Sequence, residues 1–178
     1  MKIFLYILFI AFLFSNSFAS SEKELHKKIS EVKTLGFKFN QTLNGKDEKG
    51  ECIINYPGKI YCKYETRFNK IVVSNGKSLV IRSDKNNQYF RYNLESTPLS
   101  ILLNKELILN QIINLKLKDV NDKYYMLSLN EKGQEINIFF GKENLNLIGW
   151  QTEDIYQNLV ITFISKIKVN QNIDKNVF

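Results

Sequence analysis

The side chains able to carry out acid–base, nucleophilic or metal chemistry are few in this chain of 178 residues. His26 is the single histidine, and no serine or cysteine nucleophile accompanies it in a known pattern. The adjacent carboxylates Asp47/Glu48 and Glu153/Asp154 have the chemistry of acid–base pairs, but their surroundings are typical of turns. The chain has no Gly-x-Ser-x-Gly motif, phosphate-binding loop or Cys/His zinc cluster. We therefore expect no enzyme activity, no cofactor and no metal site.

The two cysteines, Cys52 and Cys62, have the spacing of a cross-strand pair and not of a redox-active Cys-x-x-Cys motif. If residues 56–58 (Tyr-Pro-Gly) form a three-residue hairpin loop, Ile54 faces Ile60 and the two cysteines face each other. Their pair then falls at a non-hydrogen-bonded position, where the strands lie closest and a disulfide fits. The alternative is two free buried thiols, because a two-residue loop would shift the register.

The elements that must position these side chains are one helix followed by many strands. Apolar residues recur at helical spacing from Ser20 to Leu35, and Gly36 ends this helix. From Phe37 the apolar period changes to two, and residues 45–50 are typical of a polar turn. Further strands are predicted at Glu51–Tyr56, Lys59–Tyr64, Lys70–Val73, Ser78–Arg82, Gln88–Tyr92, Tyr124–Asn130, Glu135–Gly141, Leu145–Thr152 and Leu159–Val169.

A helical segment interrupts these strands. Thr97 is suited to cap it and Pro98 to its first turn, which predicts one helix or two short helices rich in leucine. Several strands are apolar on both faces, notably residues 71–73, 78–81 and 159–164. The second face of such a sheet must be covered. Either the helices fill the inside of a curled sheet, or they leave an apolar pocket for a ligand, and periodicity alone does not choose between the two.

The first 19 residues are typical of a secretory signal peptide. Lys2 provides the positive start, residues 3–14 are an unbroken apolar run, and Ser17 and Ala19 supply the small-x-small cleavage pattern. The run is too short to span a bilayer, which needs about twenty helical residues. We expect cleavage after Ala19 and an exported chain of one domain, residues 20–178, that does not span a membrane; an uncleaved anchor is the alternative.

The charge of the chain is moderately basic. The formal net charge is +7, and removal of Lys2 with the signal peptide leaves +6. The basic residues are spread over a Lys/Asn/Ile-rich sequence and form neither a cluster nor an RNA-recognition pattern with aromatic residues. We expect no nucleic-acid partner.

Six segments, in order along the chain, resemble the periplasmic outer-membrane lipoprotein carrier family (LolA) of Gram-negative bacteria. They are residues 37–41 (Phe-Lys-Phe-Asn-Gln), 50–64 with its central Pro-Gly-Lys, 73–79, 97–103, 147–150 together with Asp154, and 170–178. Each segment alone is weak, but the ordered set behind a signal peptide is fairly specific. The residues that match the family pattern one by one are Phe39, Pro57, Gly76, Pro98 and Trp150.

The resemblance implies a mainly β fold, an unclosed antiparallel β-barrel with an N-terminal helix and a central helical lid over an apolar cavity. It also implies a periplasmic carrier that takes the acyl chains of lipoproteins from an inner-membrane ABC-type release complex and delivers them to an outer-membrane receptor. Tyr56 occupies the switch position before the hairpin proline, where the family commonly has an arginine that holds the lid, so that switch does not carry over. Cys52 and Cys62 replace large apolar residues at facing positions, which favours the disulfide.

A carrier of acyl chains needs an apolar wall, since each methylene removed from water contributes about 0.8 kcal/mol. From strand parity we predict that the sheet and the lid share this wall: Phe37, Phe39, Ile71, Val73, Leu79, Ile81 and Trp150 from the sheet, with Leu99, Leu102 and Leu103 from the lid. Two other classes of protein stay open at this point. One is a periplasmic regulatory protein with a related half-barrel that senses lipid or lipoprotein, and the other is a periplasmic hydrolase with a carboxylate pair.

Overall fold

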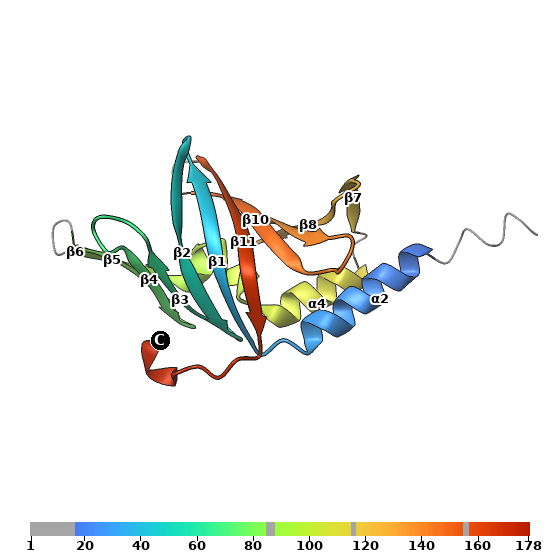
Figure 1. The fold of residues 1–178 in the computed structure, drawn as a ribbon, viewed down its shortest axis with the longest axis horizontal. Helices are drawn as coiled ribbons and strands as arrows, with labels where there is room; N and C mark the ends of the chain where they lie inside the picture. The colour runs from blue at the N-terminus through green and yellow to red at the C-terminus, as the bar shows by residue number, and fades with distance from the viewer. Residues whose placement is uncertain (1–16, 85–87, 115–116, 155–156) are drawn as a thin grey trace, which may run out of the picture.

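The computed structural model describes residues 17–84, 88–114, 117–154 and 157–178. In these residues the chain forms one antiparallel sheet of 11 strands in the order β6-β5-β4-β3-β2-β1-β11-β10-β9-β8-β7. The sheet curls without closing, as Figure 1 shows, which confirms the predicted unclosed antiparallel barrel. The strands are β1 (Thr34–Leu43), β2 (Lys46–Asn55), β3 (Lys59–Tyr64), β4 (Ile71–Asn75), β5 (Ser78–Ser83), β6 (Gln88–Asn93), β7 (Lys118–Asn121), β8 (Tyr124–Glu131), β9 (Gln134–Gly141), β10 (Leu147–Glu153) and β11 (Leu159–Val169).

The N-terminal helix is shorter than predicted at its C-terminal end. Helix α2 spans Ser17–Ser30, whereas Leu35 and Gly36 lie in β1. Leu35 fits the helical spacing of the preceding apolar residues, but its backbone pairs with Ile54 on β2 and with Val169 on β11. Pairing on both sides outweighs the weak helical preference of one residue.

The β1–β2 hairpin is longer than the sequence indicated. Residues 46–50, predicted as part of a polar turn, continue the ladder with β1. The turn itself is Asn44–Gly45, whose φ angles of 50° and 70° suit a type I′ hairpin turn. The polarity of this segment therefore reflects a projecting hairpin and not a chain reversal. Strand β7 escaped prediction because all of its residues are exposed and show no apolar alternation.

The β2–β3 hairpin has the predicted register. Ile54 pairs with Ile60, and Cys52 pairs with Cys62. Gly58 has a φ of 79°, the left-handed conformation expected for the last residue of this loop. A Cβ atom on Gly58 would lie 2.9 Å from the Cα atom of Gly76, so both conformation and space require glycine there.

The central helical segment is a pair of short helices, α3 (Leu99–Leu102) and α4 (Lys105–Asn114), preceded by the 3₁₀ turn η1 (Leu94–Ser96). The sequence had suggested that the side chain of Thr97 caps this helix, but it does not cap α3. The Thr97 hydroxyl instead donates to the Leu94 carbonyl oxygen over 2.8 Å, and Pro98 occupies the N-cap position. A short 3₁₀ turn, η2 (Lys175–Val177), lies near the C-terminus.

Helices α2 and α4 pack against strands β9–β11 and form the core there. α2 and α4 lie side by side (Figure 1). The fully buried members of this region share apolar, mostly branched side chains: Leu25, Ile101, Leu102, Leu103, Ile112, Leu127, Ile136 and Ile138. A void of about 70 Å³ remains between the helices and the sheet, so this end of the barrel is filled.

Strand β11 is apolar on both faces, but only one face is covered. Leu159 and Phe163 are 46% and 53% exposed on the convex face, which corrects the expectation that both faces of this strand would be buried. Further along, Lys166 has a φ of 51°, and the register between β1 and β11 shifts by one residue between Gly36 and Lys38. This bulge re-aims the end of the strand, so that Ile167 packs against the core.

Candidate functional site

A cavity of about 660 Å³ lies on the concave side of the sheet, next to the filled end. This volume is within the range of about 300–1,000 Å³ that small-molecule sites have. Its apolar wall comes from β1–β6, α3 and β10–β11: Phe39, Cys52, Ile60, Cys62, Val72, Leu79, Ile81, Tyr92, Leu99, Trp150 and Val160. A polar margin accompanies it, which includes Gln41, Glu48, Tyr64, Lys70, Asn137 and Thr162.

Strand pairing explains which side chains reach this wall. Cross-strand partners point to the same face of a sheet. Cys62 pairs with Val72, and Val72 pairs with Ile81, so these three residues face the cavity together. Ile71 and Val73 point to the opposite face of β4 and are absent from the wall, which corrects their predicted orientation. Three consecutive apolar residues gave no parity signal in the sequence.

The structure brings five of the predicted wall residues together at the cavity. They come from three strands and the lid: Phe39, Leu79, Ile81, Leu99 and Trp150. Phe37 lies just behind the wall, where its ring meets the Trp150 ring edge-on at a centroid distance of 6.0 Å.

The other two lid leucines are not part of the wall. Leu102 and Leu103 are each 1% exposed. Leu102 lines the small void between the helices and the sheet, and the Leu103 carbonyl oxygen accepts a hydrogen bond from the Gly58 amide over 3.0 Å. Leu99 is therefore the predicted lid leucine that faces the cavity, while its two neighbours join the lid to the rest of the core.

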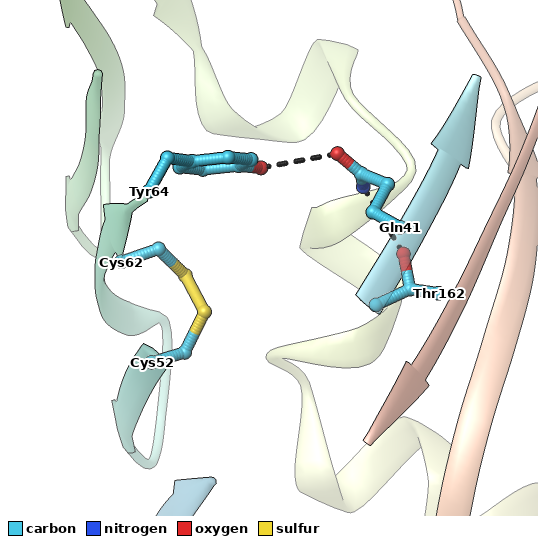
Figure 2. Close-up of a disulfide and its surroundings, with 5 residues drawn as sticks. All are labelled: Gln41, Cys52, Cys62, Tyr64 and Thr162. Carbon is cyan, nitrogen blue, oxygen red and sulfur yellow. Dashed lines mark hydrogen bonds between the residues drawn. A yellow bond between two sulfur atoms is a disulfide. The ribbon is translucent and has the colours of Figure 1, made fainter. Parts of the chain in front are cut away.

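The disulfide forms part of the cavity wall. Cys52 and Cys62 are joined through their sulfur atoms, and their Cα atoms are 4.1 Å apart. Figure 2 shows the bond on the strand pair β2–β3, with Tyr64 on the same face. Both residues are 5% exposed, so the disulfide presents an apolar surface to the cavity while covalently tying two strands of its wall.

A row of hydrogen-bonded side chains crosses the polar margin of the cavity from β3 to β11. The Tyr64 hydroxyl donates to Gln41 Oε1 over 3.2 Å, and Gln41 Nε2 donates to Thr162 Oγ1 over 3.0 Å (Figure 2). Thr162 is 2% exposed, and a buried hydroxyl of this kind needs a partner. These two hydrogen bonds thus link strands on both sides of the curled sheet and satisfy the polar groups of the margin.

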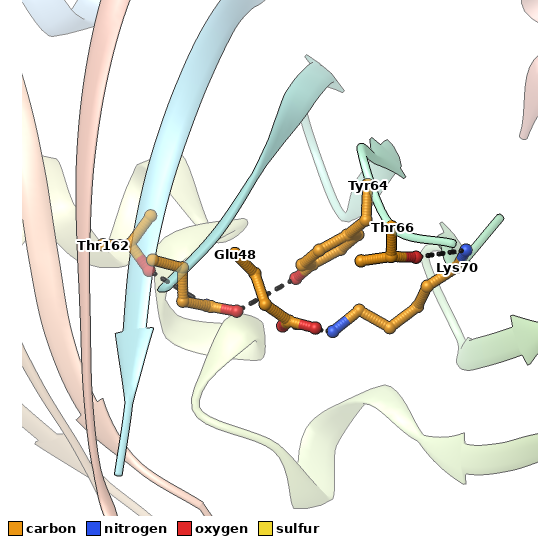
Figure 3. A network of polar contacts seen from close by, with 6 residues as sticks. Glu48, Tyr64, Thr66, Lys70 and Thr162 are labelled. Atoms are coloured by element: carbon orange, nitrogen blue, oxygen red, sulfur yellow. Dashed lines mark hydrogen bonds and ion pairs between the residues drawn. The ribbon is translucent and has the colours of Figure 1, made fainter. Parts of the chain in front are cut away.

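A charged pair lies beside these hydrogen-bonded side chains. Lys70 Nζ donates to a Glu48 carboxylate oxygen (Figure 3) and lies 3.8 Å from the centroid of the Tyr64 ring. Burial raises the pKa of the Tyr64 hydroxyl, and the nearby negative charge of Glu48 raises it further, so Tyr64 stays a neutral hydrogen-bond donor. Together these groups give the otherwise apolar cavity one polar side.

Sequence reasoning missed this polar side because it placed Asp47 and Glu48 in a turn. Both belong to β2, where they point to opposite faces, so they do not form an acid–base pair. Asp47 accepts from the Thr42 hydroxyl over 2.6 Å. The signal that could have revealed Glu48 is the alternation of Gly50, Cys52 and Ile54, extended two residues backwards. In the second pair, Glu153 is the last residue of β10, which corrects its predicted place in a turn. Asp154 follows the strand and accepts hydrogen bonds from Asn158, as expected for a turn.

The lid is held to α2 by a lysine from the lid itself. Lys105 Nζ at the start of α4 donates to the carbonyl oxygens of Ser30 and Val32 over 3.1 and 3.0 Å. These carbonyls lie at and just beyond the C-terminal end of α2, where the helix dipole favours a cation. Tyr56, at the position where the family commonly has its switch arginine, lines the small void beneath the lid, and burial raises the pKa of its hydroxyl.

An open half-barrel with a preformed apolar cavity and a helical lid defines the class of this molecule: a protein that binds apolar ligands. Within that class the chain belongs to the LolA family, since residues 30–178 match the model of the outer membrane lipoprotein carrier protein LolA. Family membership makes it a periplasmic protein that binds lipid or lipoprotein, among relatives that are carriers or binders and not enzymes. In the described residues no helix is long and apolar enough to cross a membrane.

Three solved structures are similar to this chain at very low sequence identity. An uncharacterized conserved protein from Thermus thermophilus is 6% identical, with a TM-score of 0.50, and the match covers 89% of this chain and 91% of that one. A LolA superfamily protein from Nitrosomonas europaea is 8% identical over 88% and 96% of the two chains, with a TM-score of 0.47. MucB is 9% identical over 89% of this chain and 61% of its own, with a TM-score of 0.48. Comparison with curated proteins gave no match.

Proposed function

We propose that this protein is a carrier that shields the acyl chains of lipoproteins while they cross the periplasm. It accepts them from an inner-membrane ABC-type release complex and delivers them to an outer-membrane receptor. The mature chain is residues 20–178, a single domain released by signal cleavage after Ala19. The observation that carries this proposal is the cavity of about 660 Å³ with its apolar wall.

The wall residues that we propose to contact acyl chains are Phe39, Leu79, Ile81, Leu99 and Trp150. Each methylene left in water costs about 0.8 kcal/mol, so an unshielded acyl chain cannot leave a membrane at a useful rate. Burial in the cavity removes most of this cost.

A carrier must also release its cargo without ATP, and the lid supports this step. Opening the lid would break the two hydrogen bonds of Lys105 and the packing of Leu102 beneath the helices. That cost subtracts from the binding free energy of the cargo, so the closed empty state favours release to a receptor. In this protein Lys105 supplies the cation that holds the lid to α2, and Tyr56 fills the space below the lid.

The proposal is tested by ligand binding and transfer with the mature protein. We expect saturable binding of an environment-sensitive C16 fatty-acid probe, displacement by a triacylated lipoprotein, and transfer of that lipoprotein to vesicles that carry the receptor. Ile81→Gln should weaken probe binding, whereas Val80→Gln, on the other face of the same strand, should not.

Two results would contradict the proposal. Absence of saturable binding would exclude the apolar cavity as a ligand site. Binding of lipoprotein as one stable complex, without transfer to membranes, would identify a sensor instead of a carrier.

A further inference from the structure

One apolar cross-strand row of the concave face does not stop at the cavity. It consists of Cys52, Cys62, Val72, Ile81 and Phe90, which are paired in this order from β2 to β6. The first four line the cavity. Exposure rises along the row, from 5% at both cysteines and 7% at Val72 to 55% at Phe90. We call this set the apolar row; it leads from the buried disulfide to the open edge of the sheet.

The convex face of the same strands has a different character. The neighbouring row there pairs Lys63, Ile71, Arg82 and Tyr89, and it begins with Glu51 on β2. Three of these five residues are charged and exposed. Phe90 and Tyr89 are thus adjacent on β6 and both exposed, at 55% and 72%, but only Phe90 continues an apolar surface.

The length of the apolar row fits one acyl chain. Four strand spacings of about 4.8 Å separate β2 from β6, which gives about 19 Å. An extended hydrocarbon with bonds of about 1.5 Å advances about 1.3 Å per carbon, so a chain of sixteen carbons also spans about 19 Å. A shorter chain would leave part of the row uncovered.

From this match we infer that one acyl chain binds along the apolar row, across the strands, with Phe90 at its point of entry. This inference rests on the proposed function and adds the path and the orientation of the ligand. The inner end of the row is closed by Phe37 and Trp150, which are 4% and 5% exposed. Among the described residues β6 ends the strand order of the sheet, so no further strand closes the outer end.

The orientation follows from these two ends. The terminal methyl group lies against the disulfide, and the polar end of the lipid lies near Phe90. The polypeptide of a lipoprotein is far larger than the cavity and must stay outside, which requires its attachment point at the open edge. An exposed phenylalanine in this place covers the last methylenes of the chain as they leave the cavity.

The first test compares two exposed positions on the same strand. In Phe90→Ser the Kd of a C16 fatty-acid probe should rise about four- to fifteenfold, which corresponds to lost burial of one or two methylenes at about 0.8 kcal/mol each. A C10 probe should bind Phe90→Ser as it binds the wild type, because it does not reach β6. Tyr89→Ser is the matched control and should change neither Kd. Both side chains are exposed, so neither variant should unfold the protein.

The second test reads the orientation. Trp150 is the only tryptophan, and its fluorescence should be quenched most by a C16 fatty acid that carries a nitroxide near the methyl end. In the variant Phe90→Trp/Trp150→Phe, a nitroxide near the carboxyl end should quench most.

The outcomes separate the two proposals. If no probe binds to the wild type, the proposed function fails. If probes bind but Phe90→Ser and Tyr89→Ser behave alike, or if the quenching pattern is reversed or independent of label position, the acyl chain does not follow the apolar row and only this inference is overturned.

Discussion

Reduction of the Cys52–Cys62 disulfide should lower the stability of the mature protein by about 3 kcal/mol. The bond closes a loop of about eleven residues, because the two cysteines are 10 positions apart, and the chain-entropy relation gives about 3 kcal/mol for a loop of this length. For a domain of this size that loss lowers the melting temperature by about 6–12 °C. With a urea m-value of about 2 kcal/mol/M, the unfolding midpoint falls by about 1.5 M.

The assay is urea unfolding of the same preparation with and without dithiothreitol. Thiol labelling of the denatured protein should detect no free thiol before reduction and two afterwards. The variant Cys52→Ala/Cys62→Ala is the control, and its midpoint should not respond to dithiothreitol. Two reactive thiols in the unreduced protein, or an unchanged midpoint after complete reduction, would refute the argument that the bond restrains the unfolded chain.

Three further predictions concern the lid and the buried tyrosines. Lys105→Met removes both hydrogen bonds to the end of α2. Hydrogen exchange of the α4 amides should become about tenfold faster, for a loss of about 1.4 kcal/mol. Unchanged exchange would show that the lysine does not hold the lid. Leu102→Asp places an unpaired charge at a site that is 1% exposed. Access of the probe to the cavity should rise and lipoprotein retention should weaken, while the circular dichroism of the sheet is kept. The control Ile113→Asp, at a position 69% exposed, should change neither probe access nor retention. If Leu102→Asp simply unfolds, Leu102 belongs to the permanent core. Burial raises the pKa of Tyr56 and Tyr64 in the folded state, so as the pH rises the unfolded chain loses these protons first, at about pH 10. The contribution of these groups to stability should therefore be complete below that pH and decrease above it. Urea unfolding between pH 8 and 11 would measure this decrease, which should be smaller in Tyr56→Phe/Tyr64→Phe.

The sequence predicted the fold best where turn residues mark the ends of an apolar run. Strands β3 and β11 were predicted with their observed bounds, Lys59–Tyr64 and Leu159–Val169, and the loop before Lys59 set the pairing of the two cysteines. Prediction failed where a residue satisfied two patterns. Leu35 suited the helix and also the strand, and only its partners on β2 and β11 decided.

The candidate site was predictable in its apolar part and not in its polar part. Phe39 alternates with the polar residues Lys38 and Asn40, so parity placed it correctly at the cavity. Ile71 and Val73 could not be oriented, because Val72 between them is also apolar. Glu48 and Lys70 are separated by 22 positions, and their meeting depends on how far β2 extends, which the charges of the hairpin concealed.

The place of β11 between β1 and β10 has a consequence for how this molecule acquires its structure. Strands β1–β6 pair with their neighbours in sequence, as do β7–β10, so each group is a meander of local contacts. Only β11 joins them, and its partner β1 lies more than 100 positions earlier, as in the pair Thr42 and Ile161. Closing so long a loop is slow. Until that step the two groups of strands are separate sheets, and each has an unpaired edge strand that can aggregate. The cavity is also incomplete, because its wall takes residues from both groups. Ligand binding should therefore be among the last properties to appear during folding.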